Sequence, residues 1–268
     1  MLENPRSPRV RAVAKLSKRS ARVETGLFLL EGPQAVREAL RYLPEAIVDL
    51  FATPTSWEKH ADIREFAAAA QVDVEYVTED VLASMADTVT PQGLVAVARQ
   101  TPTSVKDIFA ASPRLIAICE EVRDPGNLGT IIRAADASGA DAIVLTGRTV
   151  DPYNPKVVRS TTGSLFHLPI SVGGDLNDVI TRAHTAGLQV LAADVKGDDL
   201  LAARAAGVLD RPTAWLFGNE ARGLESDALA QADQALKLPI FGRAESLNLA
   251  TAASVCLYES AFSQRASD

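Results

Sequence analysis

The sequence predicts an α/β protein built on a mostly parallel sheet. Apolar segments of strand length alternate along most of the chain with segments whose apolar residues recur at helical spacing. The run 115–121 (LIAICEE) is almost wholly apolar, as is typical of a central parallel strand covered on both faces. The 268 residues suffice for one large domain or two of ordinary size.

The N-terminal part alternates short helices and strands. Helices are predicted at 9–26, 33–43, 62–71 and 77–87, and strands at 28–32, 46–53, 72–77 and 93–99. Pro33 stands near the start of its helix, where a missing N–H costs little. We therefore expect a smaller α/β domain over 1–104, followed by a linker that is rich in Pro, Ser and Thr.

A second and larger domain is predicted over 112–268. Strands are predicted at 115–121, 142–147, 168–172, 188–195, 213–218 and 234–240, and helices at 127–140, 155–164, 175–187, 226–233 and 246–265. Because a strand that returns to a parallel neighbour needs a helical crossover, this alternation favours a mostly parallel sheet.

Several classes of protein are disfavoured by what the chain lacks. No run of about 18 uncharged apolar residues could span a membrane, and the basic N-terminus has no apolar stretch of a secretory signal. Cys119 and Cys256 lie in apolar runs and are interpreted as buried free thiols, which indicates a reducing cytoplasm. The three histidines are scattered, and no acid or cysteine cluster has ligand spacing, so no metal site is expected.

Positive charge is concentrated at the N-terminus. The net charge is −7, yet residues 1–22 carry seven basic side chains against Glu3, which makes that segment +6 and leaves −13 elsewhere. Either this is a solvated helix or tail, or it is a basic arm that meets RNA phosphates. The candidate RNA-binding residues are Arg6, Arg9, Arg11, Lys15, Lys18, Arg19 and Arg22.

Three polar segments follow predicted strands in a fixed order. They are 127–133 (NLGTIIR), 216–224 (LFGNEARGL) and 238–253 (LPIFGRAESLNLATAA). Each alone has a structural interpretation, as a helix cap, a tight turn and a second helix cap. Together they predict one site, since the carboxyl ends of parallel strands meet at a single edge of a sheet.

These three segments closely resemble the motifs of the SpoU, or TrmH-like, family of RNA 2′-O-ribose methyltransferases in the SPOUT class. The resemblance covers 114–265. The preceding module is similar to the L30e-like substrate-binding domain of the ribosomal-RNA branch, whose opening segment resembles FLLEGPQAVREAL. The resemblance implies a trefoil-knotted catalytic domain, S-adenosylmethionine as methyl donor, a structured RNA substrate, most simply 23S ribosomal RNA, and a homodimer.

The resemblance also assigns roles to residues of this chain. The active-site positions fall on Arg133, Asn127, Glu220, Ser246 and Asn248. The cofactor-binding positions fall on Gly218, Asn219, Leu238, Ile240 and Leu247. Asn219 stands where Ser or Ala is more usual, and 249–251 (LAT) replaces Val-Ser-Val, which affects the details of cofactor geometry.

Arg133 resembles the residue that activates the 2′-hydroxyl. Arginine stays protonated in proteins and is a poor base. Two accounts remain open at this point: transient deprotonation assisted by an RNA phosphate, or a guanidinium that clamps phosphate and stabilises developing alkoxide charge. Asn127, Ser246 and Asn248 are expected to bind the flipped ribose and phosphate, and Glu220 to orient Arg133 or the cofactor amine.

Other functions fit the sequence less well. A nicotinamide-dependent oxidoreductase needs a glycine-rich first βα turn, and the turn here reads EEVRDPGNLG. A non-catalytic RNA-binding protein would be expected to lack Arg133 or Asn127, and both are present. A transfer-RNA substrate is the alternative within the family, but its members usually have short helical extensions instead of a full N-terminal module.

Overall fold

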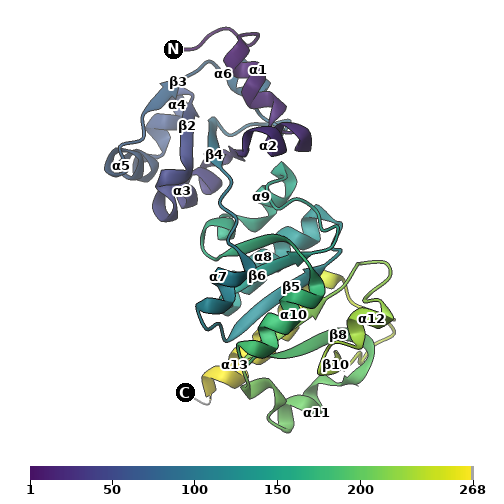
Figure 1. Cartoon of the computed structure of the whole chain (residues 1–268). Helices are drawn as coiled ribbons and strands as arrows, with labels where there is room; N and C mark the ends of the chain where they lie inside the picture. The colour runs from purple at the N-terminus through teal and green to yellow at the C-terminus, as the bar shows by residue number, and fades with distance from the viewer. Residues whose placement is uncertain (267–268) are drawn as a thin grey trace. The chain divides into compact units, whose positions relative to one another are not determined.

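The computed structural model describes residues 1–266, which pack as two compact units (Figure 1). The first unit contains residues 1–101 and, from farther along the chain, residues 151–167. The second contains residues 102–150 and the chain from residue 168 onward. In the described part of the chain, no helix is long and apolar enough to cross a membrane.

The first unit is built on a four-stranded mixed sheet with the order β1-β4-β2-β3. These strands are β1 (Leu27–Glu31), β2 (Ile47–Ala52), β3 (Val74–Tyr76) and β4 (Leu94–Arg99). β4 pairs antiparallel with β1 and β2, whereas β2 and β3 are parallel. The helices of this unit are α3 (Gly32–Tyr42), α4 (Pro54–Lys59), α5 (Ala61–Ala69) and α6 (Glu79–Met85), with a 3-10 turn η1 (Pro44–Ala46).

The N-terminal segment forms two helices, α1 (Pro8–Lys15) and α2 (Arg19–Thr25), where the sequence predicted one. The break falls at Lys18, whose backbone is extended. There the Nη1 group of Arg22 donates to the carbonyls of Leu16 and Ser17, at 2.8 and 2.9 Å, which satisfies groups that a continuous helix would have bonded internally. Val10 and Leu16 are buried in the core of the unit, so the predicted arm is an integral part of the fold.

Residues 151–167 lie within the predicted catalytic domain, yet they pack in the first unit. They form α9 (Pro155–Thr161) and η2 (Ser164–Phe166). Asp151 forms an ion pair with the buried Arg22 at 2.7 Å, and Arg159 forms one with Glu31 at 3.0 Å. The predicted domain boundaries at 104 and 112 therefore remain predictions. By packing, residues 151–167 belong to the first unit, although they follow both boundaries in the sequence.

The second unit contains the six-stranded parallel sheet, in the order β10-β8-β9-β5-β6-β7. Its strands are β5 (Leu115–Glu120), β6 (Ala142–Thr146), β7 (Ile170–Gly174), β8 (Gln189–Asp199), β9 (Thr213–Phe217) and β10 (Gln234–Lys237). Every pairing in it is parallel, which confirms the predicted α/β class. The central strands β5 and β9 are almost entirely buried, as their apolar composition requires.

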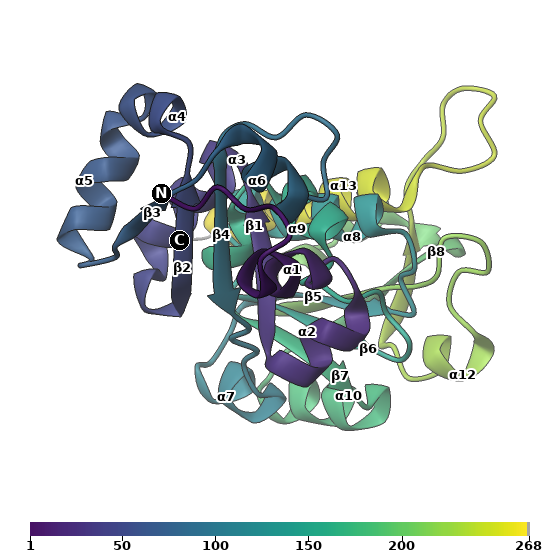
Figure 2. The ribbon, with the colours of Figure 1, turned by 90° about the horizontal axis from the view of Figure 1, so that it is seen from above.

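Helices cover both faces of this sheet (Figures 1 and 2). α7 (Val105–Ala110) and α10 (Leu176–Thr185) share one apolar cluster with β5. α8 (Pro125–Ser138) and α13 (Leu249–Ala266) lie side by side on the other face. There the indole N–H of Trp215 on β9 donates to the Ser260 hydroxyl on α13 at 2.9 Å, which satisfies both buried polar groups.

Some element boundaries differ from the sequence prediction. α7 lies in the predicted linker, and α11 (Leu200–Ala205), η3 (Val208–Asp210) and α12 (Ser226–Leu229) complete the unit. β10 ends at Lys237 and α13 begins at Leu249, so the third motif is mostly irregular chain between them. The reason is local: Pro239 cannot donate to a strand ladder, and the first side chain that caps α13 is Asn248.

Candidate active site at the carboxyl edge of the parallel sheet

Three loops leave the sheet at the same edge, because each follows a strand of one parallel sheet. The first joins β5 to α8, the second joins β9 to α12, and the third joins β10 to α13. They carry the three sequence motifs, so the fold brings together residues that are about a hundred positions apart in the chain.

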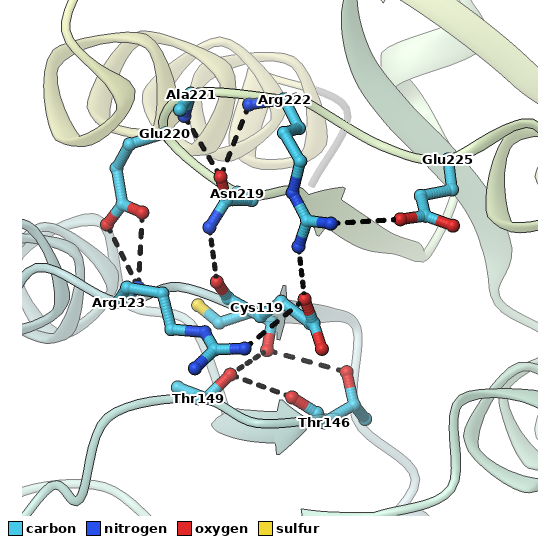
Figure 3. A network of polar contacts seen from close by, with 10 residues as sticks. Cys119, Arg123, Thr146, Thr149, Asn219, Glu220, Ala221, Arg222 and Glu225 are labelled. Carbon is cyan, nitrogen blue, oxygen red and sulfur yellow. Dashed lines mark hydrogen bonds and ion pairs between the residues drawn. The ribbon is translucent and has the colours of Figure 1, made fainter.

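The loop after β9 is a tight turn held by Asn219. Its side-chain oxygen accepts from the backbone N–H groups of Ala221 and Arg222 at 3.0 and 3.2 Å, and its backbone pairs with Gly223 (Figure 3). A Cβ atom on Gly218 would lie 2.5 Å from the Gly223 carbonyl carbon, far inside any contact distance. Glycine at 218 is therefore required for the two ends of this turn to approach each other.

Glu220 projects from this turn onto the start of α8. Its carboxylate accepts from the backbone N–H of Arg123 at 3.1 Å (Figure 3) and from that of Asp124 at 2.9 Å. These are N–H groups that a helix start leaves without internal partners, where negative charge is favourable. Within one chain the Glu220 carboxylate is engaged by the residues that enter α8, and it makes no contact with Arg133 among the described residues; the expectation that Glu220 orients Arg133 or the cofactor amine stays a prediction.

Asn127 joins all three loops. Its Nδ2 group donates to Glu220 Oε1 at 3.3 Å, and its Oδ1 atom accepts from Nδ2 of Asn248 at 2.9 Å. Asn248 in turn caps α13, because its Oδ1 accepts from the backbone N–H of Ala250 at 2.9 Å. Asn127 itself is not the cap of α8; Asp124 caps that helix by accepting from the Asn127 backbone N–H at 2.8 Å.

An ion-pair network ties the first two loops together beside this chain of amides. Glu121 pairs with Arg222 at 2.6 Å and with Arg123 at 3.4 Å, and Asn219 Nδ2 donates to the Glu121 backbone carbonyl at 2.9 Å (Figure 3). Partial burial opposes ionisation, but the two guanidinium groups outweigh it and hold the pKa of Glu121 below its ordinary value. The carboxylate is therefore charged and clamps the loops.

A polar cavity of about 340 Å³ lies beside the same network. Its lining includes Glu121, Asn177, Asn219 and Arg222. Of the residues predicted to bind cofactor, only Asn219 contributes to it. The cavity therefore does not coincide with the predicted cofactor positions in the third loop.

Two predicted active-site residues make no hydrogen bond to the network of Asn127, Glu220 and Asn248. Arg133 lies on α8 and is exposed, and within residues 1–266 its guanidinium has no hydrogen-bond or ion-pair partner. Ser246 is exposed in the third loop and, among the described residues, likewise makes no side-chain contact. The structure thus assembles Asn127, Glu220 and Asn248, and leaves the other two facing solvent.

The third loop has the chemistry of a nucleoside site. Leu238 is partly buried, and Ile240 and Leu247 are 38% and 42% exposed, so apolar side chains line the loop. No backbone N–H or C=O group of residues 238–247 is hydrogen-bonded to another group of the described chain. An adenosine moiety needs apolar contacts for its base and hydrogen-bond partners for its polar atoms. The apolar side chains and the unbonded backbone groups of this loop offer both. The residues present therefore fit S-adenosylmethionine.

The N-terminal cations divide into two groups. Arg22 is 1% exposed and donates to Asp151, Leu16 and Ser17, so its assignment as an RNA-binding residue is wrong: its donors hold the fold. Arg9 pairs with Asp49 and Glu75 and covers the Phe51 ring. The remaining cations are exposed, and their side chains have no partner within the described residues; they are Arg6, Arg11, Lys15, Lys18 and Arg19.

Both cysteines are free and buried. Burial raises the pKa of the Cys119 thiol to about 12, with a further contribution from the charge of Glu220, and burial raises that of Cys256 to about 12. Neither thiol is a nucleophile at neutral pH.

Sequence reasoning missed three contributors to the site, namely Glu121, Asp124 and Arg222. The pattern Asp-Pro-Gly-Asn at 124–127 is a helix-start signal that predicts the Asp124 cap. Nothing in the sequence indicates that Glu121 and Arg222 meet, because they are 101 residues apart and each alone is an ordinary surface charge.

A parallel α/β unit whose strand-end loops bring amides and a carboxylate to one edge belongs to the class of domains that bind ligands at that edge, and it is joined to a second module. Comparison with known families identifies both parts. Residues 114–258 match the SpoU rRNA Methylase family, and residues 7–96 match the MRM3-like substrate binding domain. The chain belongs to the SpoU rRNA methylase family, which confirms the resemblance drawn from the motifs.

Relatives are similar over nearly the whole chain. An uncharacterized tRNA/rRNA methyltransferase of Synechocystis is 35% identical over 96% of this chain and 92% of its own. The 23S rRNA (guanosine(2553)-2′-O)-methyltransferase of Bacillus subtilis is 31% identical, covering 96% and 97%. The crystal structure of an AdoMet-bound rRNA methyltransferase from Sinorhizobium meliloti is 32% identical, with a TM-score of 0.81 over 97% and 96% of the two chains.

Proposed function

We propose that this protein transfers the methyl group of S-adenosylmethionine to a ribose 2′-hydroxyl of 23S ribosomal RNA. The observation that carries the proposal is the contact of the three motifs through Glu220, Asn127 and Asn248. Membership of the SpoU family and similarity to a 23S rRNA 2′-O-methyltransferase support the substrate and the atom that is modified. Such a substrate also places the protein in the cytoplasm, with the ribosomes.

Bound S-adenosylmethionine supplies an electrophilic methyl group, so the protein must mainly position the acceptor oxygen and manage one proton. Leu238, Ile240 and Leu247 hold the adenosine part by apolar contact and through the free backbone groups around them. The Asn127–Asn248 pair presents amide groups at the same edge for hydrogen bonds to the ribose and its phosphate. Glu220 keeps Asn127 oriented by accepting from its Nδ2 group.

Arg133 acts as an electrostatic clamp in this mechanism. Its guanidinium is exposed, so it can bind a phosphate and stabilise negative charge on the 2′-oxygen. The proton then passes to an RNA phosphate or to water. Asn127 and Arg133 are six positions apart, which places them about 120° apart around an α-helix. Their side chains therefore leave the helix in different directions on a single protomer.

In a homodimer, Arg133 of one chain can serve the site that contains Asn127 of the other chain. The exposed apolar patch of α13 consists of Val255, Tyr258 and Phe262, which are 37%, 36% and 55% exposed. Tyr258 donates to the Ala137 carbonyl of α8 at 3.3 Å, so the patch borders the helix that carries Arg133. If two copies pack through this patch, the Arg133 of one protomer is brought to the partner's loops and completes its site.

The trefoil knot implied by the family is part of the proposal. Its support is the path of the C-terminal chain: β10 is an edge strand, yet α13 returns to pack under the central strands β5 and β9. Between them, the chain of residues 238–248 reaches the start of α8, where Asn248 donates to Asn127.

The function is tested by incubating the purified protein with S-adenosylmethionine and in vitro transcribed 23S ribosomal RNA, and mapping 2′-O-methyl positions by mass spectrometry of nuclease fragments. We expect one ribose of the transcript to be methylated and bulk transfer RNA to remain unmodified. Methylation of transfer RNA alone would establish the alternative substrate. Methylation of a base, or none with wild-type protein that binds both ligands, would refute the proposal.

A further inference from the structure

The loop between β10 and α13 carries an exposed aromatic residue that the proposed mechanism does not use. Phe241 is 89% exposed, more than any other aromatic side chain of the described residues; Phe262 follows at 55%. Leaving a phenyl ring in water forgoes the favourable free energy of burying it, so a partner that covers the ring gains that free energy. A ring held in this position is available to a planar partner.

The surroundings of Phe241 are open. Residues 238–247 have no regular secondary structure and form no internal backbone hydrogen bond within the described chain. Gly242, the next residue, has no atom within 4 Å of the position where a Cβ would be. The segment leaves the body of its unit as a long loop (Figure 2). The ring therefore has room on its faces for a base.

The position of Phe241 in the loop relates it to the reaction. Ile240, which precedes it, is one of the positions proposed to hold the cofactor, and Ser246 and Asn248 are proposed to bind ribose and phosphate. Phe241 thus stands between the two groups of ligand-binding residues. A nucleotide whose ribose enters this site carries a base and neighbours that must be unstacked from their own helix.

The loop of residues 238–248 carries no net positive charge that would attract RNA phosphates. Arg243 is its one cation and Glu245 its one anion, and both are exposed, so the net charge of 238–248 is zero. A neutral loop with a solvated phenyl ring can contact nucleic acid by stacking, which is available to every base and contributes about 1–3 kcal/mol per base.

We propose that Phe241 stacks on an unpaired nucleobase of the RNA strand that carries the target ribose, and so helps to hold that nucleotide out of its helix. The inference rests on the proposed function, because the ring is assigned to the same RNA that is methylated. Phe241 is a positioning residue, since it contacts the substrate strand away from the reacting atoms. The alternative partners of the Phe241 ring are the cofactor and a second copy of the chain.

The test compares Phe241→Ala and Phe241→Trp with the wild type. Leu201→Ala serves as a matched control, because Leu201 is an exposed apolar residue (45%) on α11 of the same unit. Binding of in vitro transcribed 23S ribosomal RNA is measured in the presence of S-adenosylhomocysteine, so that no methyl transfer occurs. Cofactor affinity is measured by calorimetry and oligomeric state by light scattering.

Stacking predicts that Phe241→Ala weakens RNA binding about 5- to 150-fold, with KM for RNA rising and cofactor affinity and oligomeric state unchanged. Phe241→Trp should restore binding, and its added fluorescence should be quenched by RNA and not by cofactor. Unchanged RNA affinity, an equal loss of cofactor affinity, or dissociation of the oligomer would overturn the inference. Wild-type protein that binds the transcript without methylating it would refute the proposed function alone.

Discussion

The Nδ2 atom of Asn248 lies 2.9 Å from the Oδ1 atom of Asn127, although 121 residues separate the two in the chain. Each amide has a second partner that fixes its orientation. Asn127 donates to Glu220, and Asn248 accepts from the first turn of α13. A continuous line of hydrogen bonds therefore runs from the carboxylate of the second motif, through the first, to the helix that follows the third.

If this line of hydrogen bonds positions the substrate, its two asparagines act as a unit. Asn248→Ser keeps an oxygen that can cap α13 but removes the amide that reaches Asn127. We expect Asn248→Ser and Asn127→Ala each to lower kcat/KM by about tenfold or more, and the double variant to lose less than the product of the two. Thermal unfolding should change little, since an exposed hydrogen bond contributes only about 1 kcal/mol. Strictly multiplicative losses would mean that the two residues act independently.

Arg133 should matter for chemistry and not for the cofactor. We expect Arg133→Ala to abolish methyl transfer while S-adenosylmethionine affinity stays within a few-fold, because the guanidinium has no contact with the cofactor loop of its own chain. Single-turnover assays and calorimetry measure the two quantities. Near-normal turnover would remove Arg133 from the mechanism.

The proposed homodimer allows a complementation test with two variants, each of which is impaired in its own homodimer. If Arg133 serves the partner's site, mixing Arg133→Ala with Asn127→Ala after mild dissociation should recover about a quarter of wild-type activity, because half of the dimers then contain one intact site. Phe262→Asp in the α13 apolar patch should give monomers in light scattering and abolish the recovery. Activity that stays near zero in a verified heterodimer would place each site within one chain.

The exposed cations of the first unit should contribute to RNA affinity through their charge. Replacing Arg11 and Lys15 by Gln is expected to weaken RNA binding and to lower the slope of log affinity against log salt by about 0.7 to 0.9 for each RNA phosphate that is no longer neutralised. Lys59→Gln with Lys106→Gln is a control of equal charge. If both double variants show the same slope of log affinity against log salt, α1 is only a solvated helix that does not contact RNA. Deleting 1–22 would not be a clean test, because it also removes Val10 and Leu16 from the core.

Unlike the exposed cations, Arg22 is expected to contribute to the stability of the first unit and not to RNA affinity. Arg22→Gln leaves the partly buried Asp151 without its ion-pair partner, and breaking one side of a fully buried pair typically costs about 3–5 kcal/mol, so this value is an upper bound here. We expect a large drop in the free energy of unfolding of the first unit, measured by urea denaturation. The RNA salt slope of the remaining folded protein should not change. A stable variant with a reduced slope would return Arg22 to the RNA-binding set.

Gly218 tests the turn that presents Glu220. Gly218→Ala places a methyl group 2.5 Å from the Gly223 carbonyl carbon, so the turn must open. We expect loss of cofactor binding together with a lower melting temperature, whereas Gly173→Ala, where nothing lies within 4 Å, should be strained only through its backbone angle. Cofactor affinity at the wild-type level in Gly218→Ala would mean that the turn adapts without cost to the site.

The amino-acid sequence by itself determined the fold class, the two modules, the family and the three motifs of the site. These depend on local patterns: the apolar period of strands and helices, and short polar segments at strand ends, which remain legible without knowing what packs against them. That is why the strands of the parallel sheet could be predicted, and why the three polar segments that carry Asn127, Glu220 and Asn248 were expected at one edge of it.

Only the tertiary structure decided what each charged or polar side chain does. Arg22 was predicted to bind RNA with its neighbours, but its guanidinium is buried against Asp151, 129 residues away. Glu220, expected to orient Arg133 or the cofactor amine, accepts from the backbone N–H groups of Arg123 and Asp124 ahead of α8, while Glu121 and Arg222 form an ion pair that nothing in the sequence indicated. The energy of a charge depends on which partner and how much water surround it, and both are set by contacts distant in sequence.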